Sequence, residues 1–407
     1  MTVTSFTLGL LALLAADFPW PQWGGPTRDF QVSAPIAETW GEEGPPVVWS
    51  RPFGEGYSTI VCDGPRLFSL LRRPDTDEEV LVALDAATGE TEWEASWKAP
   101  IEEDMDVEFG PGPHSTPVLV GDLVIAVGVT VKVHAVDRVT GERRWSRDLR
   151  AELGATHLKR GYCASPIARD DVVIFPIGGE DQALVALDQE TGEIAWKGHT
   201  FGWSYCTPLM IDWQDGPELI VFWEDAVGGV DPANGAERWR IDHVNSWRVN
   251  VSTPVWDAAT GMLFVSSAYG LGSRGIRLRR EAGETIAEDV WQERRVQVHH
   301  GNAVVIGDRV YASSGRGPAA FAAIDLATGE LAWRDRAIGK ATILAVDGRM
   351  LILEDSGDLI LASGGSEGLE IHARATVLQP LAWSAPTLVG TRLFIRDRES
   401  MKALDLE

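Results

Sequence analysis

Polar and aromatic residues recur just ahead of short β-strand patterns, and together they could bind a ligand. Five of these patterns contain a proline, at positions 117, 166, 208, 254 and 386. The residues three or four positions upstream, with their equivalents in other units, are Tyr57, His114, Tyr162, Tyr205, Asn250, His300, Lys340 and Trp383. Such a set offers donors, acceptors and a flat face to a small planar or polyhydroxylated ligand.

Two further expectations attach to these candidate residues. Four residues nearby in the sequence could join them, namely Arg160, Trp203, Arg248 and His299. Histidines that titrate near neutrality would make ligand binding depend on pH between about 5.5 and 7.5. The alternative is that these side chains satisfy one another and ordered waters inside a plugged channel.

Other catalytic and metal-binding signals are weak. The chain has no nucleophile elbow, zinc-protease helix, phosphate-binding loop or glycine-rich dinucleotide turn. The acidic stretch "EEDMDVEFGPGPH", residues 102–114, either binds calcium or is simply solvated. Cys163 and Cys206 lie three and two positions before a proline, on opposite strand faces, so we expect these two and Cys62 to be buried free thiols. No metal site is predicted.

One motif recurs five times and indicates the elements that carry these residues. It appears as "ALDAATGETEW", "AVDRVTGERRW", "ALDQETGEIAW", "GVDPANGAERW" and "AIDLATGELAW", always with Gly four residues after Asp and Trp four residues after Gly. Aspartate accepts hydrogen bonds from turn amides, and glycine supplies the positive φ that closes a short hairpin. The tryptophans, which we expect to dock neighbouring repeats, are Trp93, Trp145, Trp196, Trp239 and Trp333.

A second repeated piece lies upstream of each turn and completes a four-stranded unit. Segments such as "STPVLVGDLVIAV" and "SAPTLVGTRLFI" are two short strands joined by a Gly or Asp turn. Units of four strands in about 40 to 50 residues have the size of a propeller blade. Two further units are degenerate. One ends at Trp291 after the insertion "GLGSRGIRLRREAGE", and in the other His372 occupies the Trp position.

The eighth unit is split between the two ends of the chain. Three strands in the last 23 residues, "APTLVGTRLFIRDRESMKALDLE", stop where a turn and a Trp strand should follow, and "GPPVVWS" near Trp49 is a strand without a blade. Pairing these pieces closes the ring and leaves no open edge. We therefore predict an all-β, eight-bladed propeller over residues 18–407. Trp20, Trp23 and Phe30, in the turn-rich "WPQWGGPTRDF", should anchor the N-terminal segment across the seam or over one face.

The net charge limits the classes of partner that we expect, and the first residues of the chain indicate its cell compartment. The chain carries 36 Lys and Arg against 60 Asp and Glu, a net charge of −24, which argues against a nucleic-acid partner. An apolar run followed by Ala15 and Ala16 predicts a signal peptide over residues 1–17, although a packed or disordered apolar terminus remains the alternative. The run is too short to span a membrane. We expect a periplasmic or extracellular product.

The repeated "ALDxxTGxxxW" and the lead-in "WPQWGGPTRD" resemble the pyrroloquinoline quinone (PQQ)-like repeat family. Its eight-bladed propeller is shared by quinoprotein alcohol dehydrogenases and by the scaffold lipoprotein of the outer-membrane β-barrel assembly machinery. The dehydrogenases hold the quinone between a Trp and a disulfide of adjacent cysteines, beside calcium. This chain has no adjacent cysteine pair, so the resemblance disfavours PQQ with calcium as a cofactor.

The function expected from this evidence is a non-catalytic binding or scaffold propeller of the cell envelope. Its partners would be proteins or peptides, with a small-molecule ligand as a further expectation for the candidate residues. The alternative is a PQQ-dependent or related oxidoreductase that acts on a small alcohol or sugar. The missing cysteine pair and haem motif favour the scaffold, whereas the polar candidate residues leave the oxidoreductase as the alternative function.

Overall fold

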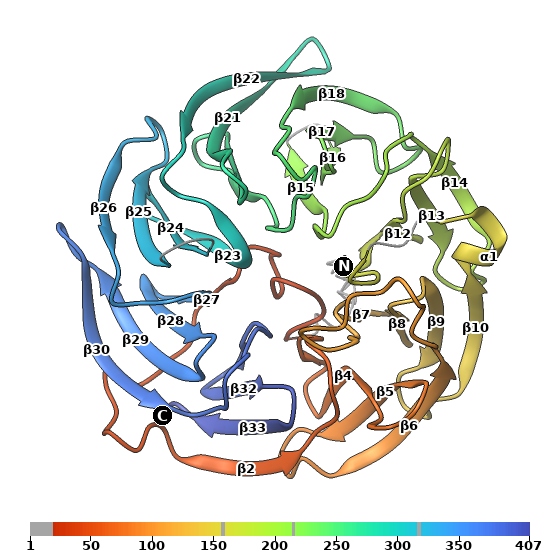
Figure 1. Cartoon of the computed structure of the whole chain (residues 1–407), viewed down its shortest axis with the longest axis horizontal. Helices are drawn as coiled ribbons and strands as arrows, with labels where there is room; N and C mark the ends of the chain where they lie inside the picture. Colours follow the sequence, from red (N-terminus) through yellow and green to blue (C-terminus); the bar gives the residue numbers. More distant parts are fainter. Residues whose placement is uncertain (1–18, 156–158, 214–215, 316–318) are drawn as a thin grey trace, which may run out of the picture.

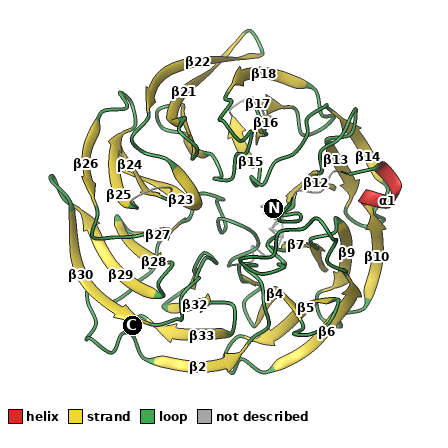
Figure 2. Ribbon diagram, in the orientation of Figure 1, coloured by secondary structure: helices red, strands yellow, loops and turns green. Residues whose placement is uncertain are grey.

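The computed structural model describes residues 19–155, 159–213, 216–315 and 319–407, and nearly all regular structure in these ranges is β-strand (Figure 2). Eight sheets, each with four antiparallel strands, are arranged around a common axis (Figure 1). The predicted all-β, eight-bladed propeller is confirmed. The predicted signal peptide, residues 1–17, lies outside the described residues.

The blades follow the chain in order, from the inner strand to the outer one. Blade 1 is β3 (Val61–Cys62), β4 (Arg66–Arg72), β5 (Glu78–Asp85) and β6 (Thr91–Lys98). Blade 2 is β7 (Val118–Val120), β8 (Leu123–Val127), β9 (Lys132–Asp137) and β10 (Arg143–Asp148), followed by the short helix α1 (Leu149–Leu153). Blade 3 is β11 (Ile167–Arg169), β12 (Val172–Pro176), β13 (Leu184–Asp188) and β14 (Ile194–Gly198). Blade 4 is β15 (Leu209–Trp213), β16 (Gly216–Phe222), β17 (Ala226–Val230) and β18 (Glu237–Asp242).

The second half of the ring repeats the pattern with two changes. Blade 5 is β19 (Val255–Asp257), β20 (Met262–Ser267), β21 (Gly272–Glu281) and β22 (Glu284–Glu293). Blade 6 is β23 (Val298–Ile306), β24 (Arg309–Ser314), β25 (Ala320–Asp325) and β26 (Leu331–Asp335). Blade 7 is β27 (Ala341–Val346), β28 (Arg349–Glu354), β29 (Asp358–Gly364) and β30 (Leu369–Thr376), with β1 (Gln31–Val32) added beside β27. Blade 8 is β31 (Thr387–Val389), β32 (Arg392–Arg396), β33 (Ser400–Asp405) and β2 (Val47–Pro52).

The two ends of the ring carry different connections. Strands alternate in direction, so the link from one blade's outer strand to the next blade's inner strand shares an end with the link between the second and third strands. We call this end the loop face. The opposite end, the turn face, carries the Asp-x-x-Thr-Gly turns. The candidate ligand residues precede the inner strands and therefore belong to the loop face.

The repeated turn has the chemistry that the motif predicts. In blade 1, Asp85 Oδ1 accepts hydrogen bonds from the amides of Ala87 at 3.0 Å and Thr88 at 2.8 Å. Gly89 follows with φ of 73°, a conformation that favours glycine. The hydrogen bonds from Thr88 lower the pKa of Asp85. The motif is therefore a structural turn on the surface.

A β-bulge places each outer-strand Trp at a fixed position. In blade 1, Trp93 lies opposite Ala83, and the register then shifts so that Thr91 lies opposite Leu84. The same shift occurs in blade 7, where Ala373 lies opposite Leu361. The expectation that His372 holds the Trp position of blade 7 is therefore wrong by one residue.

The chain ends close the ring inside blade 8, as predicted. β2 pairs antiparallel with β33, with Val47 opposite Leu404 and Trp49 opposite Ala403. The amide of Ala37 also donates to the carbonyl of Leu406 at 2.6 Å. Trp49 thus takes the bulged Trp position of the eighth blade, and the last strand of that blade comes from the N-terminal part of the chain (Figure 1).

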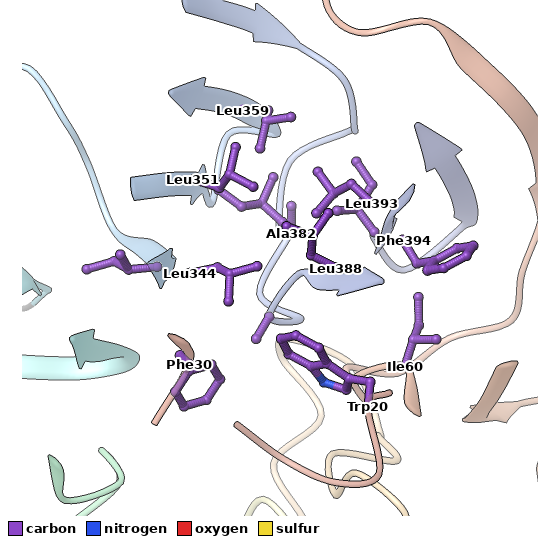
Figure 3. Close-up of a cluster of buried hydrophobic side chains, with 14 of the residues drawn as sticks. Trp20, Phe30, Ile60, Leu344, Leu351, Leu359, Ala382, Leu388, Leu393 and Phe394 are labelled. Atoms are coloured by element: carbon purple, nitrogen blue, oxygen red, sulfur yellow. The ribbon is translucent and has the colours of Figure 1, made fainter. Parts of the chain in front are cut away.

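The N-terminal segment, residues 19–37, crosses the turn face. Trp20 and Phe30 are buried among side chains of blades 7 and 8, including Leu344 and Leu388 (Figure 3). Hydrogen bonds link this segment to six blades, through Cys62, Leu119, Ala168, Thr253, Ala345 and Leu406. The three aromatic residues are therefore anchors, and the segment spans one end of the ring.

Candidate functional site

Four aromatic rings from four blades stack on one another at the loop face. Tyr57 stacks on His114 with ring centroids 5.7 Å apart and on Trp383 at 5.1 Å. His300 stacks on the Trp383 ring at 4.6 Å with an interplanar angle of 11°. The structure thus brings four of the eight candidate residues together: Tyr57, His114 and Trp383 lie in loops that lead into inner strands, and His300 lies in β23 itself. We call this group the ring stack.

Phe109 and Arg160 border the ring stack. The Tyr57 hydroxyl donates to the carbonyl of Phe109, and the Phe109 ring lies 5.3 Å from that of Trp383. The Arg160 guanidinium lies over Phe109 at 5.0 Å, and the Arg160 amide donates to the Tyr205 hydroxyl at 3.2 Å. Tyr205 is therefore linked to the ring stack through Arg160. Sequence reasoning missed Phe109 because it lies inside the acidic loop.

Lys340 contributes to a small cavity beside the ring stack. His300, Thr342, Asp355 and Trp383 also line this cavity, whose volume is about 10 Å³. This volume suits about one water molecule. A ligand of the size of a sugar or a quinone does not fit into it. The alternative given by the sequence, side chains that fill the axis and contact one another, describes this end of the channel well.

Tyr162 and Asn250 do not join the ring stack. Tyr162 is 4% exposed and packs in an apolar cluster with Val127 and Phe175. The Asn250 side chain donates to the carbonyl of Trp223 and accepts from the Ser267 hydroxyl at 2.6 Å. Both residues support the packing around their own blades, so two of the eight candidate positions have surroundings that differ from the expected ligand site.

Burial lowers the pKa of two of the candidate histidines. Loss of hydration lowers the pKa of His114 to about 4. Loss of hydration, followed by the charges of nearby His299 and Lys340, also lowers the pKa of His300. Burial raises the pKa of Tyr57 to about 12. The two lowered pKa values argue against the expected pH dependence between about 5.5 and 7.5, because they favour neutral imidazoles in that range.

The residues present do not fit a quinone held beside calcium. Cys62, Cys163 and Cys206 are free thiols, and burial raises the pKa of each. In the described part of the chain, no three His, Cys, Asp or Glu side chains are grouped so as to hold a metal ion. Trp383 already stacks on two rings, those of Tyr57 and His300. These rings use stacking surface of Trp383 that a planar cofactor would need.

Arginines neutralise part of the acidic loop, residues 102–114. Arg150 forms an ion pair with Glu102. Arg160 lies 2.9 Å from Asp106 and 3.5 Å from Glu108. These pairs fold the loop across neighbouring blades. Cations of the protein thus occupy carboxylates that a calcium ion would need.

Four of the five predicted docking tryptophans donate a hydrogen bond to a backbone carbonyl of the next blade. The indole nitrogen of Trp145 donates to the Gln189 carbonyl at 2.8 Å, and that of Trp196 donates to the Pro232 carbonyl at 2.9 Å. The acceptor is the residue directly after the motif Asp of the next blade. Trp49, Trp93 and Trp291 bond the corresponding carbonyls, and Trp333 bonds the Gly365 carbonyl. Trp239 instead donates to Glu218 in its own blade.

Sequence reasoning missed an exposed aromatic surface on the loop face. Trp247 is 63% exposed and Val244 is 49% exposed, both in the loop between β18 and β19. The Trp247 ring lies 6.0 Å from that of Tyr269. Large exposed apolar side chains beside one another often mark protein contacts. The only signal in the sequence was a tryptophan outside the repeat motif.

No helix among the described residues is long and apolar enough to cross a membrane. A family model described as outer membrane protein assembly factor BamB matches residues 38–196, 76–271 and 224–373. The chain is 24% identical over 306 residues to BamB of Yersinia pestis, covering 70% of this chain and 72% of that protein. It is 23% identical over 331 residues to BamB of Shewanella oneidensis, covering 77% and 78%.

Solved structures show the same fold. BamB from Moraxella catarrhalis has a TM-score of 0.61 at 14% identity, covering 89% of this chain and all of that one. Quinohemoprotein alcohol dehydrogenase from Comamonas testosteroni has a TM-score of 0.64 at 13% identity, covering 95% and 80%. The fold is thus common to scaffolds and enzymes, whereas the sequence matches name the scaffold. Because the matched segments together span residues 38–373, the chain belongs to the BamB family of PQQ-like repeat propellers.

Proposed function

We propose that this chain is a non-catalytic scaffold of the bacterial cell envelope that holds a protein partner on its loop face during outer-membrane protein assembly. The family match and the relatives named as outer membrane protein assembly factors support the process and the compartment. We also propose a periplasmic location, which the relatives' part in outer-membrane assembly supports. A second function as a quinoprotein oxidoreductase lacks support, because the chain has no adjacent cysteine pair and its described residues contain no group of side chains placed to hold a metal ion.

The observation that carries the proposal is the contrast between the axis and the loop face. The axis offers a cavity of about 10 Å³ beside the ring stack, which is too small for a substrate. The loop face presents Trp247 at 63% exposure and Val244 at 49%. Exposed aromatic residues at a surface are enriched in protein interfaces and supply most of their binding energy. The exposed side chains of the loop face therefore support protein binding as the proposed function.

The test compares two surfaces of the full-length chain in its native host. A strain that lacks the gene should contain less folded outer-membrane protein, and the wild-type chain should restore the amount. Trp247→Ala with Val244→Ser should restore less. Val139→Ser is the control, because Val139 is 54% exposed on the turn face. Normal assembly in the strain without the gene would contradict the proposal.

An in vitro measurement separates the scaffold from the oxidoreductase. Purified chain is mixed with PQQ and calcium, and its melting temperature and dye-coupled alcohol oxidation are recorded. We expect neither a thermal shift nor oxidation. A shift that is lost when Trp383 is replaced by alanine would favour quinone binding instead.

A further inference from the structure

A recess opens on the loop face beside blade 1, away from the candidate residues of the axis. It has a volume of about 390 Å³ and lies between the β4–β5 loop and the loop that follows β6. In Figure 1 these loops belong to the blade of β4, β5 and β6. The volume is in the lower part of the range of ligand pockets in proteins. It is large enough for one or two side chains.

The basic groups that line the recess already have partners within the protein. Arg72 is 3% exposed, and its guanidinium donates to the Ala99 carbonyl at 2.8 Å and lies 3.8 Å from Glu79. Arg73 forms ion pairs with Glu78, at 3.7 Å, and with Glu94. Neither arginine is therefore available to attract an acidic ligand.

Two acidic groups of the lining have no such partners. Asp75 and Asp77 are exposed in the β4–β5 loop and both line the recess. In the described part of the chain, no Lys or Arg lies within 4.0 Å of either carboxylate, and the nearest basic residues in sequence are held by other acids. The open rim of the recess therefore has a negative charge that the protein leaves uncompensated.

The other wall of the recess is apolar. Ile101 is 42% exposed and lines it together with Pro74 and Pro111. The methylene stem of a lysine or arginine packs well on such a surface while its charged end reaches an acidic rim. An aliphatic neighbour of that lysine would add apolar contact. The recess thus combines the two features that a basic, amphipathic side chain needs.

We propose that this recess binds a basic segment of the protein partner, with a Lys or Arg side chain next to an aliphatic residue. This inference rests on the proposed scaffold function and specifies one contact of it. The net charge of −24 attracts a basic segment over long range, and Asp75 and Asp77 fix its position. The exposed Trp247 surface lies in a different loop, so the two contacts are separable by mutation.

The probe is a fluorescent, C-terminally amidated peptide, Leu-Lys-Leu-Lys-Leu, whose binding to the full chain is measured by fluorescence anisotropy. We expect binding that weakens with added salt, because exposed charges are screened. Asp75→Asn with Asp77→Asn should weaken binding about five- to twenty-fold, as expected for two exposed charge pairs. Ile101→Ser should weaken it by a smaller factor.

The control variant has the same change in net charge at a distant place. Asp122 and Glu190 are exposed on the turn face of blades 2 and 3, so Asp122→Asn with Glu190→Gln tests nonspecific attraction. We expect this variant to bind the peptide as the wild-type chain does. Equal losses in the two double variants, or equal binding of a Leu-Glu-Leu-Glu-Leu peptide, would overturn the proposal.

A crosslinking experiment in the host distinguishes this proposal from the scaffold function. A carbodiimide joins a carboxylate directly to a lysine amine, so it should couple Asp75 or Asp77 to a lysine of the partner. Mass spectrometry should find this link in the wild-type chain and not in the double asparagine variant. If assembly depends on the chain but partner links fall only on other carboxylates, the recess proposal is wrong and the scaffold function stands.

Discussion

At the scale of single residues, two structural requirements explain why the repeated motif contains a glycine. Its positive φ closes the turn, and its missing side chain admits the Trp ring of the preceding blade. A Cβ on Gly235 would lie 2.8 Å from the Trp196 ring, and one on Gly329 would lie 2.4 Å from the Trp291 ring. Real Cβ atoms do not come so close to a packed ring. The spacing in the sequence thus connects a turn in one blade with a ring from the blade before it.

Trp291 should matter as much as the tryptophans of the regular repeats. Although its unit is degenerate in sequence, Trp291 is 8% exposed and bonds the Leu326 carbonyl at 2.8 Å. Trp291→Ala should lower the free energy of unfolding by about 3–5 kcal/mol, and the half-buried Trp196→Ala by about 2–4 kcal/mol. Urea unfolding monitored by circular dichroism checks both values.

The control for these variants is Trp247→Ala, which removes the same side chain from the surface. Because Trp247 is 63% exposed, its loss should change stability by less than about 0.5 kcal/mol. If Trp291→Ala cost no more than this control, the docking role of the repeated tryptophans would have to be abandoned.

At the scale of elements, the long β21–β22 hairpin replaces a missing turn. Blade 5 lacks the motif turn on which Trp239 would dock, and Glu218 of β16 takes over as the acceptor. The fully buried Glu218 also lies 3.1 Å from Arg280 and accepts from the Thr285 hydroxyl at 2.6 Å. Arg280 and Thr285 are paired across the hairpin. One carboxylate therefore fixes the inserted hairpin against blade 4.

Replacing Glu218 should detach this hairpin and destabilise the ring. Glu218→Ala leaves Arg280 without its buried partner and Trp239 without an acceptor, a change that typically costs about 3–5 kcal/mol. Hydrogen exchange should rise in residues 277–288 before it rises elsewhere. Glu237→Gln is the control, because Glu237 on β18 is 41% exposed and should cost less than about 0.5 kcal/mol. Unchanged exchange in the hairpin would exclude this role for Glu218.

At the scale of the whole molecule, the repeated motif made the fold predictable from the sequence. Features that occur only once in the chain could not be predicted from the repeats. The Asp, Gly and Trp spacing marked five blades, two degenerate units added two more, and the unpaired strand near Trp49 indicated the eighth blade and its closure. The repeats do not predict that Glu218 takes the place of a turn. Its partners in the β21–β22 hairpin, Arg280 and Thr285, are 62 and 67 residues away in the sequence. Two of the candidate positions differ from expectation for a similar reason. Tyr162 and Asn250 precede inner strands, but their side chains pack within the walls.

Blade 7 lacks a docking Trp because of the way in which the ring closes. Ala373 occupies the Trp position of blade 7, and the next blade has no motif turn because its third strand ends at Asp405 near the end of the chain. The segment before β2 fills this place instead. A Cβ on Gly44 would lie 3.0 Å from the Cβ of Ala375 on β30, and the Thr39 hydroxyl donates to the His372 carbonyl at 2.9 Å. The docking Trp is thus missing where its partner turn is missing.

The last prediction concerns the seam between β2 and β33, which only non-covalent contacts hold together. Ser50 and Lys402 are direct partners across it, and Ser50→Cys with Lys402→Cys should form a disulfide that links the two ends of the ring. The chain-entropy model gives a stabilisation of roughly 6 kcal/mol for so long a loop and roughly 3 kcal/mol for a short hairpin. The matched control is the equivalent pair of blade 1, Val82 and Glu94, which the chain already connects by a hairpin. Denaturant unfolding of the oxidised and reduced forms measures both effects.

If unfolding begins with opening of the seam, the seam disulfide should also slow unfolding more than the control disulfide does. Equal unfolding rates in the two oxidised variants would show that the ring first opens elsewhere.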